Sequence, residues 1–319
     1  MDIALDRAIR GFKLSNEAAG LSPRTIIWYN GNLRLFQKWL VIRGNPDPLL
    51  EQITSQMIRE YMVEMRNGSR VTFEDHPFRP QEDHPMAPRT IQAYHTSLSA
   101  FFRWAVREEL LDSSPMKNMP RPKVPRYLPD PFSEAEIRAL VNACDQFTDR
   151  SKLRLKAMIL FLLDTGVRVG ELLSVKMANL ELEQGRARVM GKGAKERDVY
   201  FGKATRNALW RYISLARPEP FQRVDNLFLY HDGRPIISRR FTSWLEELSK
   251  RSGVENVHPH RFRRTAAVQF IRNGGDLFSL QKLLGHTTLE MVRRYVELAA
   301  EDVEKAHRLA SPVDGWHLH

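Results

Sequence analysis

The stretch LELEQGRARVMGKGAKERDVYF, residues 180–201, decides the fold class because its pattern differs from that of its surroundings. Apolar and polar residues alternate here with a period of two, and two glycine-containing turns interrupt the alternation. This pattern predicts a three-stranded antiparallel meander with Lys192 in or beside the second turn. The flanking segments have a helical period instead. We therefore predict a mainly α fold with one small antiparallel β-meander.

Strong helix signals stand on both sides of the meander. Ser133 and Glu136 have the spacing of a capping box, which predicts a helix start. A buried helix through AMILFLLDTG, residues 157–166, is predicted to end at its glycine, and a further helix to begin just after it. From Lys203 onward the pattern is helical again. We predict one domain over residues 132–319.

The N-terminal part has a helical pattern of its own. Ser22 is predicted to cap a helix with Pro23 in its first turn, Thr54 to cap a second, and a third to start near Pro88. The predicted apolar faces consist of Ile26, Tyr29, Leu33, Phe36, Leu40, Ile58, Tyr61, Met62, Met65, Ile91, Tyr94, Leu98, Phe102 and Ala105. We predict a helical domain over residues 1–112, interrupted by a polar loop or hairpin at 68–88.

A proline-rich segment joins the two predicted domains. Residues 113–131 contain six prolines and four basic residues. Proline restricts its own backbone and that of the preceding residue, so such a segment is predicted to be extended and semi-rigid. We interpret it as a basic linker that can follow a phosphate backbone.

Composition narrows the class of protein. The chain has 319 residues and a net charge of +11, and both parts of it are basic, with 18 Lys and Arg against 14 Asp and Glu over residues 1–128 and 31 against 24 over residues 129–319. This charge favours a polyanionic partner, although a basic enzyme with no nucleic-acid role has the same signature. The longest apolar run, residues 157–163, is far short of a membrane span, and Cys144 is the single cysteine. With no secretory signal visible, we expect a cytoplasmic, nucleoid-associated protein without a membrane partner.

Six residues of the C-terminal part carry groups suited to attack on a phosphodiester: Arg168, Lys192, His260, Arg263, His286 and Tyr295. Arginine forks bind two phosphate oxygens at once, and lysine or histidine can transfer protons. Tyrosine needs a cationic setting or a base to become a nucleophile near neutral pH. Each residue alone also has a structural interpretation; Arg168, for example, could simply pair with Glu171 or Asp164.

Taken together and in order, the motifs DTGVRVGEL, GKGAKER, HPHRFRRT, LLGH and RRYVEL resemble the tyrosine recombinase, or phage-integrase, family of Xer-like or transposon-integrase type. The N-terminal helices resemble its SAM-like core-binding domain. The resemblance implies that Arg168 and Arg263 clamp the scissile phosphate and that Lys192 is the general acid. It makes His260 and His286 phosphate ligands or proton carriers, and Tyr295 the nucleophile that forms a 3′-phosphotyrosyl bond.

The resemblance also implies no cofactor, because the phosphotyrosine conserves the ester without ATP or metal. A zinc site at His258 and His260 is disfavoured, since Pro259 separates them and no third ligand is near. The implied partners are double-stranded DNA with specific recombination sites and further copies of the chain in a synaptic tetramer, with the C-terminal segment packed in cis or in trans. Candidate DNA contacts, which lie off the apolar faces, in the linker or next to the motif arginine, are Arg24, Arg89, Arg103, Arg121, Lys123 and Arg264.

Two features depart from the family pattern, the residue at position 264 and the long polar stretch 68–88, where the family's DNA contacts are not carried over. Arg264 stands where the family commonly has a second histidine, and it could supply a phosphate contact or a salt bridge. Two other functions are compatible with the sequence. One is an architectural or regulatory DNA-binding protein without strand exchange, which the intact set of six residues disfavours. The other is a relaxing enzyme like a type IB topoisomerase, which uses the same tyrosine chemistry.

Overall fold

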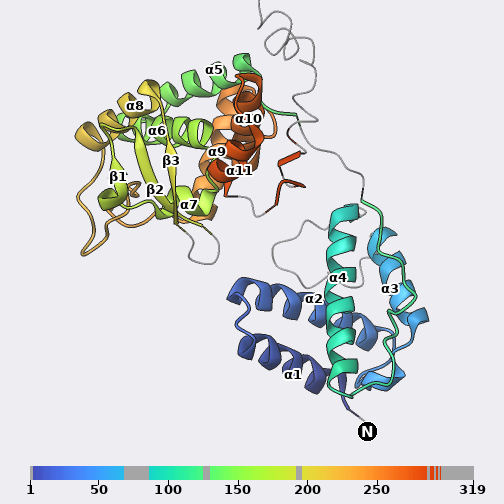
Figure 1. The fold of residues 1–319 in the computed structure, drawn as a ribbon. Helices are drawn as coiled ribbons and strands as arrows, with labels where there is room; N and C mark the ends of the chain where they lie inside the picture. Colours follow the sequence, from blue (N-terminus) through green and yellow to red (C-terminus); the bar gives the residue numbers. More distant parts are fainter. Residues whose placement is uncertain are drawn as a thin grey trace, which may run out of the picture. The chain divides into compact units, whose positions relative to one another are not determined.

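The structure, a computed structural model, describes residues 3–67, 86–124, 130–191, 196–285, 288–290, 292–293 and 295. The chain divides into two compact units, Met1–Tyr127 and Leu128–His319. Figure 1 shows helices in both units and a small sheet in the second, as the sequence predicts. None of the helices in the described ranges combines the length and the hydropathy that a membrane span requires.

The described residues of the first unit form four α-helices. They are α1 (Leu5–Ala18), α2 (Pro23–Ile42), α3 (Ser55–Asn67) and α4 (Pro88–Arg107), with a short 3₁₀ turn η1 (Leu50–Gln52) between α2 and α3. The predicted cap is confirmed, because the Ser22 hydroxyl accepts a hydrogen bond from the Thr25 N–H at 3.2 Å. Likewise the hydroxyl of Thr54, the residue before α3, accepts a hydrogen bond from the Met57 N–H at 3.2 Å.

The predicted apolar faces form the core of this unit. Phe36, Tyr61 and Phe102 are fully buried, and Tyr29 is partly buried beside them. Helix α1, which the sequence did not delineate, adds Phe12 to the same core. The predicted polar loop lies largely outside the described residues, which resume at 86.

The first part of the proline-rich segment packs on the first unit. Met116 is buried in the core of that unit. The Ser55 hydroxyl donates to the Pro115 carbonyl at 2.6 Å, and the Gln92 side-chain amide donates to the Pro122 carbonyl at 2.9 Å. Residues 115–122 are therefore anchored to α3 and α4 rather than extended away from them.

The second unit combines seven α-helices and three strands within its described residues. The helices are α5 (Glu134–Ala143), α6 (Asp149–Thr165), α7 (Val169–Ser174), α8 (Lys203–Leu215), α9 (Ser238–Ser252), α10 (Pro259–Arg272) and α11 (Leu277–Leu284). The strands are β1 (Leu180–Glu181), β2 (Arg186–Met190) and β3 (Glu196–Tyr200), and two 3₁₀ turns are η3 (Cys144–Gln146) and η4 (Met177–Asn179). The capping box of Ser133 and Glu136 is present.

The predicted meander is confirmed. The strand order is β1-β2-β3, and both pairings are antiparallel, with Ala187 opposite Val199 in the second. Lys192 falls in the connection between β2 and β3, outside the described residues.

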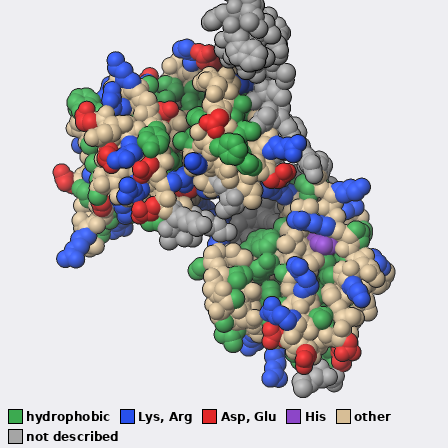
Figure 2. Space-filling view, viewed as in Figure 1, with side chains coloured by type: hydrophobic (Ala, Val, Ile, Leu, Met, Phe, Trp, Pro, Cys, Tyr) green, Lys and Arg blue, Asp and Glu red, His purple; other side chains and the backbone are tan. Residues whose placement is uncertain are grey.

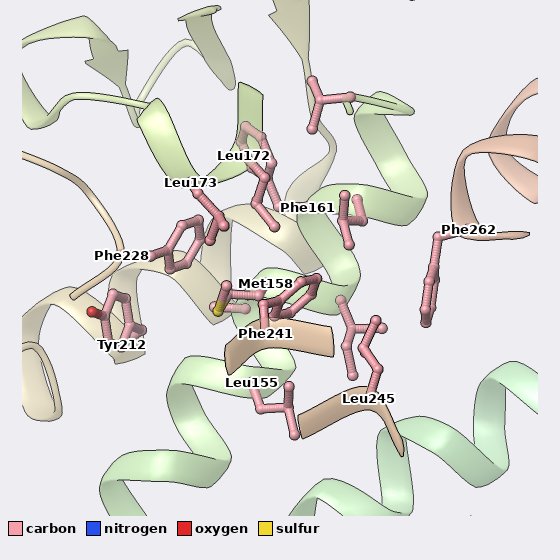
Figure 3. Close-up of a cluster of buried hydrophobic side chains, with 14 of the residues drawn as sticks. Leu155, Met158, Phe161, Leu172, Leu173, Tyr212, Phe228, Phe241, Leu245 and Phe262 are labelled. Atoms are coloured by element: carbon pink, nitrogen blue, oxygen red, sulfur yellow. The ribbon is translucent and has the colours of Figure 1, made fainter. Parts of the chain in front are cut away.

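Helix α6 is the centre of this unit. It packs against α7, α8, α10 and β3. Its buried side chains Leu155, Met158 and Phe161 meet residues from α7 and α9 in the core shown in Figure 3. The helix ends where Gly166 takes a left-handed conformation, at φ +62°. The end of α6, the start of α7, β3 and the pair α10–α11 thereby meet in one region.

Candidate active site

Arg263 is the most buried of the candidate residues. It lies on α10 and is 4% exposed. Its Nη1 donates to the Gly166 carbonyl at 2.6 Å, and its Nη2 donates to the Leu284 carbonyl at 2.7 Å. Because both acceptors are backbone atoms at helix ends, the guanidinium is held in place and also ties α6, α10 and α11 together.

The backbone carbonyls can approach Arg263 because glycine occupies the end of α6. A Cβ on Gly166 would lie 2.9 Å from Cδ2 of Leu284 and 3.4 Å from Cβ of Ala266. The residue also has a positive φ, which glycine adopts without strain. This explains why the first glycine of DTGVRVGEL, Gly166, is needed at this position.

Arg168 stands at the start of α7, three residues before a buried carboxylate. Its backbone N–H donates to Oε2 of Glu171 at 2.7 Å, and its Nη1 donates to Oε1 at 2.9 Å. The Arg168 side chain is 34% exposed, whereas that of Glu171 is 4% exposed. The pairing with Glu171 that the sequence left open is therefore present. One side of the Arg168 guanidinium is bonded to Glu171, and part of the side chain stays exposed to solvent. Asp164 instead accepts from the Gly202 N–H at 2.7 Å.

Glu171 is also bound by a second arginine, Arg197 on β3. The Arg197 Nη1 and Nη2 donate to Oε1 and Oε2 of Glu171, both at 2.8 Å. Burial acts to raise the pKa of Glu171, but the hydrogen bonds and charges of Arg197 and Arg168 outweigh it, so the net pKa is lowered. The carboxylate is thus ionised at neutral pH.

Tyr295 lies close to these arginines. It is partly buried against the small cluster of Ala267, Leu280, Leu284 and Val292. Burial lowers the pKa of Arg263 to about 10, and the charge of Arg168 adds to this, while Tyr295 and Glu171 oppose it. Arg263 therefore stays protonated at neutral pH, within electrostatic reach of Arg168 and Tyr295. The structure brings these three predicted residues together.

The remaining candidates of the C-terminal unit have different environments. His260 lies in the first turn of α10, one turn before Arg263, and is exposed. Arg264 is half-buried on the same helix, and whether it contacts a phosphate or an acid stays a prediction. His258 caps α10, because its Nδ1 accepts from the Arg261 N–H at 3.2 Å. Lys192 and His286 lie outside the described residues.

The candidate DNA contacts of the first unit are exposed. Arg24 is in the first turn of α2, and Arg89 and Arg103 are on α4. Arg121 and Lys123, in the proline-rich segment, are exposed as well. Figure 2 shows Lys and Arg side chains over both units, interspersed with other types.

Two residues of this region were missed as functional candidates from the sequence. Glu171 was considered only as an alternative partner of Arg168, and Arg197 was not considered. A signal for Arg197 was present, since it shares the strand face of the buried Val199, two positions on. An arginine on the inward face of a strand needs a buried acidic or carbonyl partner.

The described part of the site carries an excess of positive charge. Arg168, Arg197 and Arg263 contribute three positive charges and Glu171 one negative charge. Such a setting suits a phosphodiester that gains negative charge in a pentacoordinate transition state. The Tyr295 hydroxyl lies within electrostatic reach of Arg263.

Comparison with known proteins agrees with this geometry. Residues 131–302 match the model described as the phage integrase family. The chain is 32% identical over 294 residues to the tyrosine recombinase XerD of Listeria monocytogenes serotype 4b (strain F2365), covering 90% of this chain and 93% of that protein.

Solved structures share the fold. The Tn1549 transposon integrase in complex with a circular intermediate DNA has a TM-score of 0.72 at 16% identity, covering 95% of this chain and 99% of that one. A lambda integrase tetramer bound to a Holliday junction has a TM-score of 0.68 at 17% identity, covering 90% and 78%. The match over the second unit and the near full-length likeness to XerD establish that the chain belongs to the phage integrase family, the tyrosine recombinases.

Proposed function

We propose that this tyrosine recombinase cleaves and rejoins DNA at specific recombination sites through a covalent bond to Tyr295. The observation that carries the proposal is the position of Tyr295 beside Arg263 and Arg168, one buried and fixed, the other a third exposed. The second unit is then the catalytic domain. The first unit is the core-binding domain, and residues 113–131 form the connection.

In the cleavage step, the Tyr295 hydroxyl oxygen attacks the scissile phosphorus. A phosphorus–oxygen bond to tyrosine forms while the bond to the 5′ oxygen breaks, leaving a 3′-phosphotyrosyl ester and a free 5′-hydroxyl. Arg168 and Arg263 stabilise the charge that develops on the non-bridging oxygens. We assign acceptance of the tyrosine proton to His260 or His286, and protonation of the 5′ oxygen to Lys192.

Rejoining is the same step in reverse. The 5′-hydroxyl of the exchanged strand attacks the phosphotyrosyl phosphorus and displaces Tyr295, which recovers its proton. The number of phosphate esters does not change, so the exchange consumes no nucleotide. The residues act as positioning and proton-transfer groups in both directions.

In this proposal, the first unit binds the DNA backbone through exposed basic side chains. Arg89 and Arg103 are fourteen residues apart on α4, nearly four helical turns, so they share one side of the helix. Their spacing along the axis is roughly 21 Å at 1.5 Å per residue. Exposed arginines at this spacing can contact phosphates that are several nucleotides apart, and Arg24, Arg121 and Lys123 extend the basic surface.

The active assembly is proposed to be a tetramer on synapsed DNA at the nucleoid. A solved relative of the same fold, the lambda integrase, forms a tetramer on a Holliday junction. The second unit offers a groove of mixed character, lined by the apolar residues Phe132, Ile137, Leu163, Ala266, Phe270 and Leu283 and by the polar residues Ser133, Glu134, Asp164, Thr265, Gln269 and Asn273. We assign this groove to the segment LAAEDVEKAHRLA, residues 298–310, of a neighbouring protomer.

A suicide-substrate assay tests the chemistry. A duplex nicked near the cleavage point, taken from the ends of the element that encodes the protein, is incubated with the protein in EDTA and run on a denaturing gel. A band shifted by the mass of the protein is expected, and Tyr295→Phe is expected to lose it while it binds DNA as well as wild type. A requirement for added magnesium would contradict the proposed mechanism.

The same assay separates the two alternatives. An architectural DNA-binding protein would bind tightly and give no adduct on any tested end sequence. An enzyme that relaxes supercoils would form an adduct on plasmids that lack the paired sites and would yield no recombinant product. Recombinant products from two paired sites, and none from mutated sites, are expected.

A further inference from the structure

Arg197 on β3 connects the separate pieces of the candidate site. It lies beyond the hairpin turn that contains Lys192, five positions along the chain. Its Nη1 and Nη2 form a two-pronged ion pair with Glu171, the residue that holds Arg168. Its Nε donates to the Leu283 carbonyl, near the end of α11, at 2.8 Å.

The end of α11 packs closely against this guanidinium. Gly285 follows α11 in a left-handed conformation, and a Cβ there would lie 3.2 Å from Cζ and Nη1 of Arg197. His286 is the next residue in the sequence. Arg197 therefore links three pieces of the chain. It is part of the strand that follows Lys192, it is bonded to Glu171 near the start of α7, and it contacts the end of α11, which leads into His286.

The hydrogen bonds of Glu171 divide between two arginines with different exposure. Each carboxylate oxygen accepts one bond from Arg197 and one from the side chain or backbone of Arg168. The Arg197 side chain is 13% exposed, against 34% for Arg168. Arg197 thus neutralises the buried carboxylate, and the exposed part of the Arg168 guanidinium stays accessible to a ligand.

We propose that Arg197 is a positioning residue for strand cleavage. It fixes Glu171, and through Glu171 the guanidinium of Arg168, while it locks the strand after Lys192 to the end of α11 before His286. This inference rests on the proposed function of the site. It assigns Arg197 no contact with the scissile phosphate, since its described N–H groups are directed at Glu171 and Leu283.

Single-turnover cleavage of the nicked substrate tests the inference in full-length protein. Arg197→Ala is expected to slow adduct formation by about 10²-fold, the size of effect caused by a displacement of about 1 Å in a catalytic group. DNA affinity is expected to change less than threefold. Arg188→Ala is the matched control, because Arg188 is an exposed arginine on the paired strand β2 that bonds Asp198, and its rate is expected to stay within twofold of wild type.

Arg197→Lys keeps the charge and removes the fork. Lysine cannot donate to both oxygens of Glu171 and to the Leu283 carbonyl in the same planar geometry. We expect a rate at least tenfold below wild type in a variant that folds normally by circular dichroism and thermal unfolding. A wild-type rate in Arg197→Lys or in folded Arg197→Ala would overturn the inference.

The pH profile gives a readout that a merely structural role would not change. The described charged groups facing Glu171 are Arg168 and Arg197, with Arg263 nearby. Without Arg197, burial raises the pKa of Glu171 unopposed by its main partner, so the acid limb of the cleavage rate is expected to move toward neutral pH. Combining Arg197→Ala with Glu171→Gln is expected to remove this shift.

The double variant also shows whether Arg197 acts through Glu171. If it does, the logarithms of the two rate effects are not additive, and the double variant is about as slow as the slower single variant. Fully additive effects would overturn the inference, because they would show that Arg197 does not act on cleavage through Glu171. Wild-type protein without any adduct would contradict the proposed function instead, and the same cycle measured on the free energy of unfolding would then still test the Arg197–Glu171 coupling.

Discussion

Two arginines at the centre of the candidate site and the candidate DNA-contact arginines of the first unit have opposite environments. In the second unit, Arg263 is 4% exposed and held by two backbone carbonyls, and Arg197 makes two hydrogen bonds to Glu171 and one to the Leu283 carbonyl. In the first unit, Arg24, Arg89 and Arg103 are exposed. Buried guanidinium groups keep one geometry, whereas exposed ones adapt to the path of a phosphate backbone. In the proposed function, this difference matches two roles: fixed charge at the site of strand cleavage, and adaptable charge for binding DNA.

The largest effect that would sharpen this comparison is on cleavage. Arg168→Ala and Arg263→Ala are each expected to lower the single-turnover cleavage rate by about 10²-fold or more, as for the loss of one transition-state donor. Arg89→Ala, the matched exposed arginine, is expected to leave this rate unchanged once DNA is saturating. Equal rates for Arg263→Ala and wild type would refute the assignment of the phosphate clamp.

A second effect concerns stability. Arg263→Ala leaves the carbonyls of Gly166 and Leu284 without their charged donor, so we expect a loss of about 1–3 kcal/mol in the free energy of unfolding. Arg103→Ala is expected to change it by less than about 0.5 kcal/mol, as for other surface substitutions. Urea denaturation followed by circular dichroism measures both, and comparable losses in the two variants would remove the contrast between the units.

A third effect is on the pH dependence of stability. The pKa of Glu171 is lowered in the folded state, so its ion pairs stabilise the fold above the usual carboxyl range and are lost as the pH falls through the folded-state pKa. Below about pH 4.5, Glu171→Gln is therefore expected to show a shallower decline in unfolding free energy than wild type. Parallel curves for the two proteins over acid pH would contradict the ionised, doubly paired carboxylate.

The smallest effect is on DNA binding by the first unit. Arg89→Ala and Arg103→Ala are each expected to weaken binding uniformly across sequences and to reduce the slope of log affinity against log salt by about one. Arg10, which is exposed on α1 and paired with Asp6, supplies the control, and its replacement by Ala is expected to leave the slope unchanged. An unchanged slope in both α4 variants would remove α4 from the DNA interface.

Local signals explain why the elements could be predicted. The caps at Ser22 and Ser133 depend on neighbouring residues only, and both are present. The meander follows from the alternation around 180–201, and it too is confirmed. Helix α1 lacked such a signal, since no side-chain cap marks its start.

The roles of individual arginines could not be predicted in the same way. On α10, Arg261 donates to the Asp130 and Glu255 carbonyls and to Glu136, while Arg263 donates to Gly166 and Leu284. The two residues are chemically identical and two positions apart. Only the direction that each side chain takes from the helix makes Arg261 a residue that stabilises the fold and Arg263 a residue of the candidate site. That direction depends on the packing of α10 against α6, which lies far from it in the sequence. The partner of Arg197 is likewise distant in the chain.

The central claim is that Tyr295 is the residue bound to DNA. The most direct test is to isolate the adduct formed on the nicked substrate, digest it with protease and nuclease, and identify the tyrosine that carries the nucleotide by mass spectrometry. We predict a single modified peptide that contains Tyr295. A nucleotide on Tyr200 or Tyr230 instead would contradict the account, because it would place the nucleophile away from Arg168 and Arg263.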